Sequence, residues 1–130
     1  MIVSIYAAIL ALVYVQLSLY VVKVRTEKRQ SLGTGDHEEL NRAIRAHSNF
    51  IEYVPFALIL LFLNEYQGMA SHYVHILGIV FVIGRLLHAS NIAQINEKLK
   101  IRVLSMLLTF SVMIITAISL LLDATIGIYL

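Results

Sequence analysis

Four long apolar blocks, separated by short polar connections, decide what this chain can fold into. The blocks are Ile2–Val22, Phe50–Leu63, Tyr73–Leu87 and Val103–Leu122. Of the 130 residues, 59% are hydrophobic and 14% are charged, and the mean hydropathy is +0.82, which is too apolar for a soluble domain of this size. A helix that spans a membrane needs about 20 residues, which the first and last blocks supply.

The second and third blocks are too short to span a membrane unless their helices continue through the flanking polar residues. We expect helices over roughly Leu40–Tyr66 and Ser71–Ser90, with the added polar groups lining the inside of a bundle. A β-barrel would need many strands alternating in period two, and the sequence has no such pattern. The sequence therefore predicts one domain over residues 1–130, an all-α membrane protein built as an up-down bundle of four transmembrane helices.

Local signals indicate where the two middle helices begin and end. Asp36 suits an N-cap for the second helix, Gly68 suits its end, and Ser71 suits a cap for the third. Gly78 and Gly84 do not form a small-xxx-small motif, but they would permit close approach of neighbouring helices.

The basic residues are confined to two of the three connections. Every lysine and arginine except Arg85 lies within Lys23–Arg45 or Asn91–Arg102, whereas the second connection, Asn64–His72, contains only Glu65 as a charged residue. By the positive-inside rule, the first and third connections face the cytoplasm and both termini face the periplasm. The first block has no basic n-region and no small-residue cleavage pattern, so we expect it to be a retained helix. The formal charge of +2 then reflects topology, and no nucleic-acid partner is predicted.

A polar stripe interrupts the second predicted helix. Its members are Arg42, Arg45, Asn49, Glu52 and Tyr53. The spacing places the first four on one helix face and the tyrosine at its edge. Ionisable groups at the edge of a hydrocarbon layer are costly and normally face protein or trapped water, so the stripe is a candidate site.

Two interpretations of the stripe remain open from the residues alone. Arg45 suits a carboxylate, Glu52 suits an ammonium group and Asn49 can donate and accept, a set that fits a small zwitterionic, peptide-like ligand. Equally, Arg45 and Glu52 can belong to a buried polar network that joins this helix to others. Pro55 should bend the helix, either widening a pocket or as the ordinary effect of proline in a membrane helix.

Further polar candidates lie on the other helices. Arg85 and His88 share a face of the third helix, where the histidine suits a hydrogen-bonding group, a ligand contact or a haem ligand. Taken by itself, His88 is best interpreted as an interfacial histidine near the headgroups. Lys100 fits an interfacial anchor, while Arg25 and Arg102 fit either an anchor or a site. No metal site is predicted.

The segment from Arg45 to Pro55 resembles the second-helix signature of the MAPEG superfamily, the membrane-associated proteins in eicosanoid and glutathione metabolism. That signature is R-x-x-x-N-x-x-E-Y-x-P, and every specified position is present here. The tract Gly84–Leu86 in the third helix and Arg102 at the start of the fourth are also similar to the family. In layout the resemblance covers essentially the whole chain.

The resemblance implies a homotrimer that binds glutathione as its cofactor between neighbouring subunits near the cytoplasmic face. The cofactor-binding residues it implies are Arg25, Arg45, Asn49, Glu52, Tyr53, Arg85 and His88. It also implies that Arg102 is catalytic and stabilises the glutathione thiolate, because a nearby cation favours the ionised nucleophile. Family enzymes often carry tyrosine where this chain has His88, and an aromatic residue where it has Ile92.

The expected function is that of an inner-membrane glutathione transferase or peroxidase acting on small lipophilic electrophiles that enter from the membrane lipid. The chain resembles small bacterial members of the superfamily more than the leukotriene or prostaglandin enzymes, so an eicosanoid substrate is not expected. Two alternatives remain. One is a non-enzymatic membrane protein of the same fold, and the other is a small four-span transporter.

Overall fold

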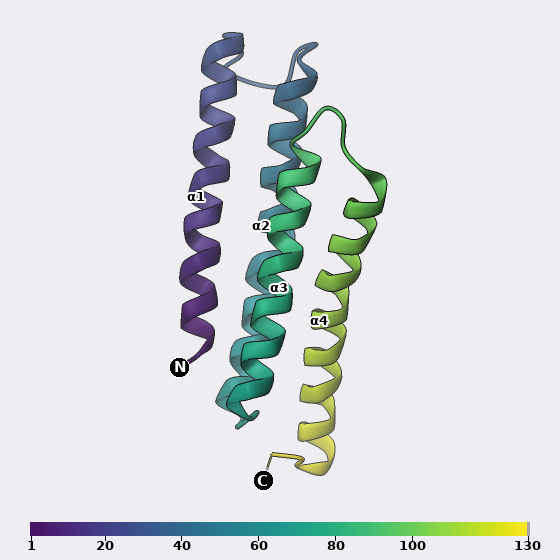
Figure 1. Ribbon diagram of the computed structural model, residues 1–130. Coiled ribbons are helices and arrows are strands. Elements are labelled where there is room, and N and C mark those ends of the chain that lie inside the picture. The colour runs from purple at the N-terminus through teal and green to yellow at the C-terminus, as the bar shows by residue number, and fades with distance from the viewer. Residues whose placement is uncertain (130) are drawn as a thin grey trace.

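The computed structural model describes residues 1–129 as four long helices joined by short connections (Figure 1). The helices are α1 (Val3–Lys28), α2 (Glu38–Tyr66), α3 (Ser71–Ile92) and α4 (Leu99–Ile126). Each is long and apolar enough to cross a membrane; even α3 extends over about 33 Å at 1.5 Å per residue. The predicted all-α class and the four spanning segments are confirmed.

Helices α2 and α3 form the centre of the bundle, because each of them packs against all three other helices. Helices α1 and α4 lie on opposite sides and make no contact with each other within residues 1–129 (Figure 1). The α1–α2 and α3–α4 connections lie at one end of the bundle, and the termini lie at the other end with the α2–α3 turn. The two connections rich in basic residues therefore share one end, which is called the basic end below.

The middle helices extend beyond their apolar blocks, as their flanking residues predict. Gly68 follows the end of α2 with φ of 103°, and Met69 N–H donates to the Asn64 carbonyl at 2.9 Å, so the predicted stop is confirmed. The predicted caps are wrong, because His37 and Ala70 occupy the N-cap positions and neither makes a side-chain cap bond. Helix α2 instead begins with two glutamates, whose charge suits the positive end of the helix dipole.

All four helices contribute to one apolar core. Its fully buried members include Leu10, Phe50, Leu61, Phe81 and Val112. Two glycines of α3 make the packing possible. A Cβ at Gly78 would lie 2.4 Å from the ring of Tyr6 in α1, and a Cβ at Gly84 would lie 3.2 Å from the Ser105 carbonyl oxygen in α4. The predicted close approach at both glycines is confirmed.

Polar contacts tie the ends of the helices at the terminal end of the bundle. The Glu65 carboxylate near the end of α2 accepts hydrogen bonds from the backbone N–H groups of Ile2 and Val3, the latter at 2.8 Å. This places a negative charge on the positive end of the α1 dipole. The buried Asn64 side chain donates to the Thr116 carbonyl oxygen at 3.0 Å and so joins α2 to α4. Helix α2 is thereby linked to both outer helices.

Candidate functional site

The polar stripe of α2 lies at the surface of the protomer. Arg45 and Glu52 are exposed, and Asn49 between them is half-buried. The structure records no hydrogen bond or ion pair from Arg45 or Glu52 to another side chain within residues 1–129. The interpretation of these two residues as part of a buried network inside the bundle is therefore wrong, because the helix presents them outward.

The buried cation beside the stripe is Arg85 of α3. Its side chain is completely inaccessible, and its Nη2 donates to the Asn49 amide oxygen at 2.6 Å. The guanidinium carbon lies 5.7 Å from the Phe50 ring centroid and 5.5 Å from that of Tyr53, within the range of cation–π attraction. Within the described part of the chain, no carboxylate pairs with this cation. Arg85 therefore contacts Asn49 of the stripe from the interior of the bundle, and its guanidinium does not reach the surface of the protomer.

This contact fixes how Asn49 presents its amide. A guanidinium can only donate hydrogen bonds, so the Asn49 oxygen must face Arg85. The amide NH2 group of Asn49 is consequently turned away from that contact and remains able to donate to another acceptor. The stripe thus offers a cation, a pair of N–H donors and a carboxylate in sequence along one face of α2.

His88 is also buried, with 2% of its surface accessible, and its Nδ1 has no hydrogen-bond partner among residues 1–129. The interpretation of His88 as an interfacial histidine is wrong. Helix α3 continues to Ile92, so His88 lies one turn inside the helix and on the same face as Arg85. The described residues contain no group of three metal-binding side chains around it or elsewhere.

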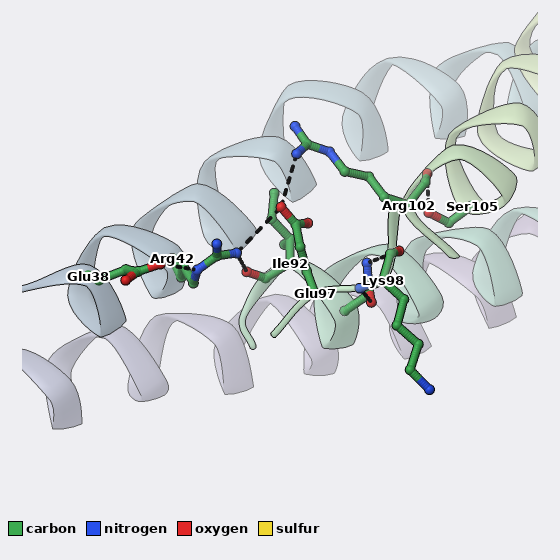
Figure 2. Close-up of polar contacts among 8 residues, drawn as sticks. Glu38, Arg42, Ile92, Glu97, Lys98, Arg102 and Ser105 are labelled. Carbon is green, nitrogen blue, oxygen red and sulfur yellow. Dashed lines mark hydrogen bonds and ion pairs between the residues drawn. The ribbon is translucent and has the colours of Figure 1, made fainter. Parts of the chain in front are cut away.

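Arg102 lies in the first turn of α4, at the basic end of the bundle. Its Nη1 is 3.3 Å from Oε1 of Glu97, and the same carboxylate oxygen is 3.5 Å from Nη1 of Arg42 on α2 (Figure 2). Arg42 also pairs with Glu38 at 3.1 Å. The catalytic candidate is therefore paired with an acidic residue that the sequence analysis did not single out. Glu97 is the only acidic residue of the third connection, and that is the signal by which it was identifiable.

Arg25 has a different position from the other predicted site residues. Its Nη1 donates to the carbonyl oxygens of Gln30 at 3.2 Å and Gly33 at 2.8 Å, so it orders the connection between α1 and α2. The structure records no contact between Arg25 and the polar stripe within the described protomer. If Arg25 belongs to the site, it must reach the stripe of another subunit.

An apolar groove runs along α4 beside the stripe. Its first part, about 280 Å³, is lined by Leu99, Arg102, Val103, Met106, Leu107 and Phe110. Its second part, about 350 Å³, is lined by Phe56, Leu60, Phe110, Met113, Ile114 and Ala117. Phe110 is common to both parts, and its ring meets the Tyr53 ring edge-on at 5.7 Å. The first part of the groove is therefore lined by the Arg102 side chain, and the second, which shares Phe110 with it, is lined by apolar residues of α2 and α4.

Four spanning helices and a polar stripe backed by a buried arginine define an integral membrane protein with a polar site beside an apolar groove. The sequence model of the MAPEG family matches residues 3–122, and the chain belongs to the MAPEG family. It is also 41% identical over 88 residues to the inner membrane protein YecN of Escherichia coli K12, a match that covers 68% of this chain and 67% of YecN. YecN of Escherichia coli O6:H1 strain CFT073 matches to the same extent. The resemblance found in the α2 signature is confirmed.

Proposed function

We propose that this protein binds glutathione on the α2 stripe and transfers it to small lipophilic electrophiles, or reduces lipid hydroperoxides with it. The observation that carries the proposal is the open row formed by Arg45, Asn49 and Glu52, whose central amide is oriented by Arg85. Within the described protomer, Arg45 and Glu52 have no side-chain partner, and Asn49 uses only its amide oxygen, so its N–H donors remain available. Membership of the MAPEG family supports the same proposal.

The chemistry of the row matches the chemistry of the tripeptide. The planar guanidinium of Arg45 suits a carboxylate of glutathione, which it can bind through two hydrogen bonds. The carboxylate of Glu52 suits the amino group of the γ-glutamyl residue. The free N–H donors of Asn49 suit a peptide carbonyl oxygen between them. Tyr53, at the edge of the row, provides an aromatic wall.

The proposed site lies between subunits of a homotrimer. The stripe is exposed in one protomer, although charged groups at the edge of the hydrocarbon layer are costly unless protein or trapped water covers them. A neighbouring subunit that covers this face would shield the stripe and would bring its own Arg25 close. The second-helix resemblance implies the same assembly.

Arg102 is the proposed catalytic residue. Glutathione supplies the thiol, and a guanidinium close to the sulfur favours its ionised, nucleophilic form. A lipophilic electrophile would reach the sulfur along the apolar groove that begins at Arg102. In conjugation, the sulfur lone pair forms a bond to the electrophilic carbon, and the electron pair of the broken bond leaves with the leaving group.

We place the protein in the bacterial inner membrane, with the basic end in the cytoplasm and both termini in the periplasm. The relative YecN is an inner membrane protein, and the basic residues of both connections gather at one end of the bundle. The positive-inside rule assigns that end to the cytoplasm. A cytoplasmic site also has access to glutathione.

Isothermal titration of the purified protein in detergent with glutathione, followed by a conjugation assay with a small aryl halide, tests the proposed function. We expect saturable binding and turnover. Saturable binding without conjugation or peroxidase turnover would favour the non-enzymatic alternative. No binding would contradict the proposal, and a proton-coupled transport assay would then address the transporter alternative.

A further inference from the structure

The carboxylate of Glu97 bridges two arginines that belong to different helices. One oxygen, Oε1, lies 3.3 Å from Arg102 Nη1 and 3.5 Å from Arg42 Nη1 (Figure 2). The second oxygen, Oε2, is buried and has no hydrogen-bond partner among residues 1–129. Tight charge-assisted pairs have N–O distances of about 2.7–2.9 Å and often use both oxygens. The two N–O distances at Glu97 are therefore longer than those of a tight ion pair, and only one of the two carboxylate oxygens has a partner.

The two arginines depend on Glu97 to different degrees. Arg42 has a second carboxylate partner in Glu38 at 3.1 Å, whereas Glu97 is the one acidic partner of Arg102 in the described part of the chain. Arg42 therefore keeps a carboxylate partner if Glu97 is displaced, and Arg102 does not. Glu97 is therefore shared by the two arginines, and removal of its charge would leave Arg102 alone without an acidic partner in the described part of the chain.

The α3–α4 connection is held by hydrogen bonds that do not involve the Glu97 carboxylate. The Asn91 side chain closes this connection, because its Nδ2 donates to the Lys98 carbonyl oxygen at 3.1 Å and its Oδ1 accepts the Lys98 N–H at 2.9 Å. This pair of bonds is made to the backbone of Lys98, the residue next to Glu97. Removal of the charge at Glu97 should therefore leave the connection folded.

We propose that Glu97 is an internal competitor for Arg102 and that it sets the pH at which the thiol of bound glutathione ionises. The inference rests on the proposed function of the site. Before glutathione binds, the carboxylate partly neutralises the guanidinium. When glutathione binds, its thiolate is a second anion beside Arg102. The thiolate either shares Arg102 with Glu97 or displaces the Glu97 carboxylate toward Arg42. Glu97 is thus a positioning residue that acts through Arg102 and reduces the electrostatic stabilisation of the thiolate by its guanidinium.

The first test compares Glu97→Gln with Glu38→Gln, measuring the ultraviolet absorbance of the thiolate of bound glutathione against pH. Glutamine keeps the shape and the accepting oxygen but removes the charge. For Glu97→Gln we expect the ionisation midpoint to fall by about 0.5–1 pH unit, a part of the shift that a charge at contact distance produces. Glu38→Gln, which contacts Arg42 alone, should keep the wild-type midpoint. An unchanged or raised midpoint in Glu97→Gln would overturn the inference.

The second test needs no glutathione. Phenylglyoxal modifies accessible arginines, and mass spectrometry measures its rate at Arg102. Loss of the competing carboxylate should make modification of Arg102 several times faster in Glu97→Gln and leave it unchanged in Glu38→Gln. Equal rates in the wild type and Glu97→Gln would overturn the inference. If Arg102 is modified faster in Glu97→Gln but the wild-type protein binds no glutathione, the Glu97–Arg102 contact is supported and the proposed function is contradicted.

Discussion

The guanidinium of Arg85 on α3 donates a 2.6 Å hydrogen bond to the amide oxygen of Asn49 on α2. The donor is fully buried and the acceptor is half-buried, so the bond links the interior of the bundle to the surface that carries the polar stripe. A buried charge is stabilised by the groups around it, here the Asn49 amide, the Thr109 hydroxyl and the Met106 sulfur, together with the rings of Phe50 and Tyr53. The middle of the stripe, at Asn49 and Tyr53, is therefore supported by the core, while the charged Arg45 and Glu52 on either side of Asn49 are exposed.

Replacement of Asn49 should destabilise the bundle as well as the site. Asn49→Ala removes the strongest partner of a buried cation, and a hydrogen bond to a charged group contributes about 1.5–3 kcal/mol to the free energy of unfolding. We expect a lower thermal unfolding midpoint in detergent. Asn41→Ala, at an exposed position of the same helix, is the matched control and should unfold as the wild type does. Equal midpoints for the two variants would show that Arg85 does not depend on Asn49.

Arg102→Leu should separate thiol activation from binding. The substitution removes the cation at the proposed position of the sulfur but leaves Arg45, Asn49 and Glu52 in place. An opposite charge within about 4–6 Å lowers the pKa of an acid by about 1–3 units, so its loss should abolish the thiolate absorbance at neutral pH and move the pH–rate profile upward. Lys100→Leu is the control and should change neither. If Arg102→Leu shows the thiolate absorbance and the reaction rate of the wild type, Arg102 is not the catalytic residue. Arg25 would then be the next candidate.

Gly78→Ala should loosen the contact between α1 and α3. The added methyl group would lie 2.4 Å from the Tyr6 ring, so the ring or one of the two helices must shift. Overpacking of this kind costs about 1–3 kcal/mol. The cost should shrink when Tyr6→Ala removes the ring, and a double-mutant cycle on thermal unfolding measures this coupling. Additive effects would mean that the two residues do not meet in the membrane.

The orientation of the bundle is open to a direct test with reporter fusions. A fusion at the C-terminus should be active only with a periplasmic reporter, and a fusion within residues 31–36 only with a cytoplasmic one. The reason is the concentration of basic residues in the two connections at one end. A C-terminal fusion that is active only in the cytoplasm would reverse the assignment.

Most of the fold was predictable from the sequence, because hydrophobic length and charge placement act locally along a membrane helix. The length that a spanning helix needs predicted the extension of α2 from the block at Phe50 back to about Leu40, and the helix begins two residues earlier, at Glu38. The helix starts were less predictable. Asp36 and Ser71 have good capping side chains, yet His37 and Ala70 occupy the cap positions, because the packing and the turn geometry of the short connections decide where each helix begins.

The candidate site was predictable only in part. Helical spacing placed Arg45, Asn49 and Glu52 on one face correctly. Spacing within α3 did not reveal that Arg85 and His88 are both buried, because that depends on how α2 and α4 cover this face of the helix. The pairing of Glu97 with Arg102 and Arg42 joins two helices and a connection, and no pattern local to one segment encodes it.

Isothermal titration of stripe variants with glutathione distinguishes a binding site on α2 from a site elsewhere in the protein. In Arg45→Ala and Glu52→Gln, loss of a charged partner in a desolvated site should weaken binding by about 2–5 kcal/mol. Lys23→Ala, which removes an exposed basic residue of α1, should bind as the wild type does. Each variant must keep the oligomeric state of the wild type. Wild-type affinity for glutathione in both stripe variants would contradict the account and remove the site from this helix.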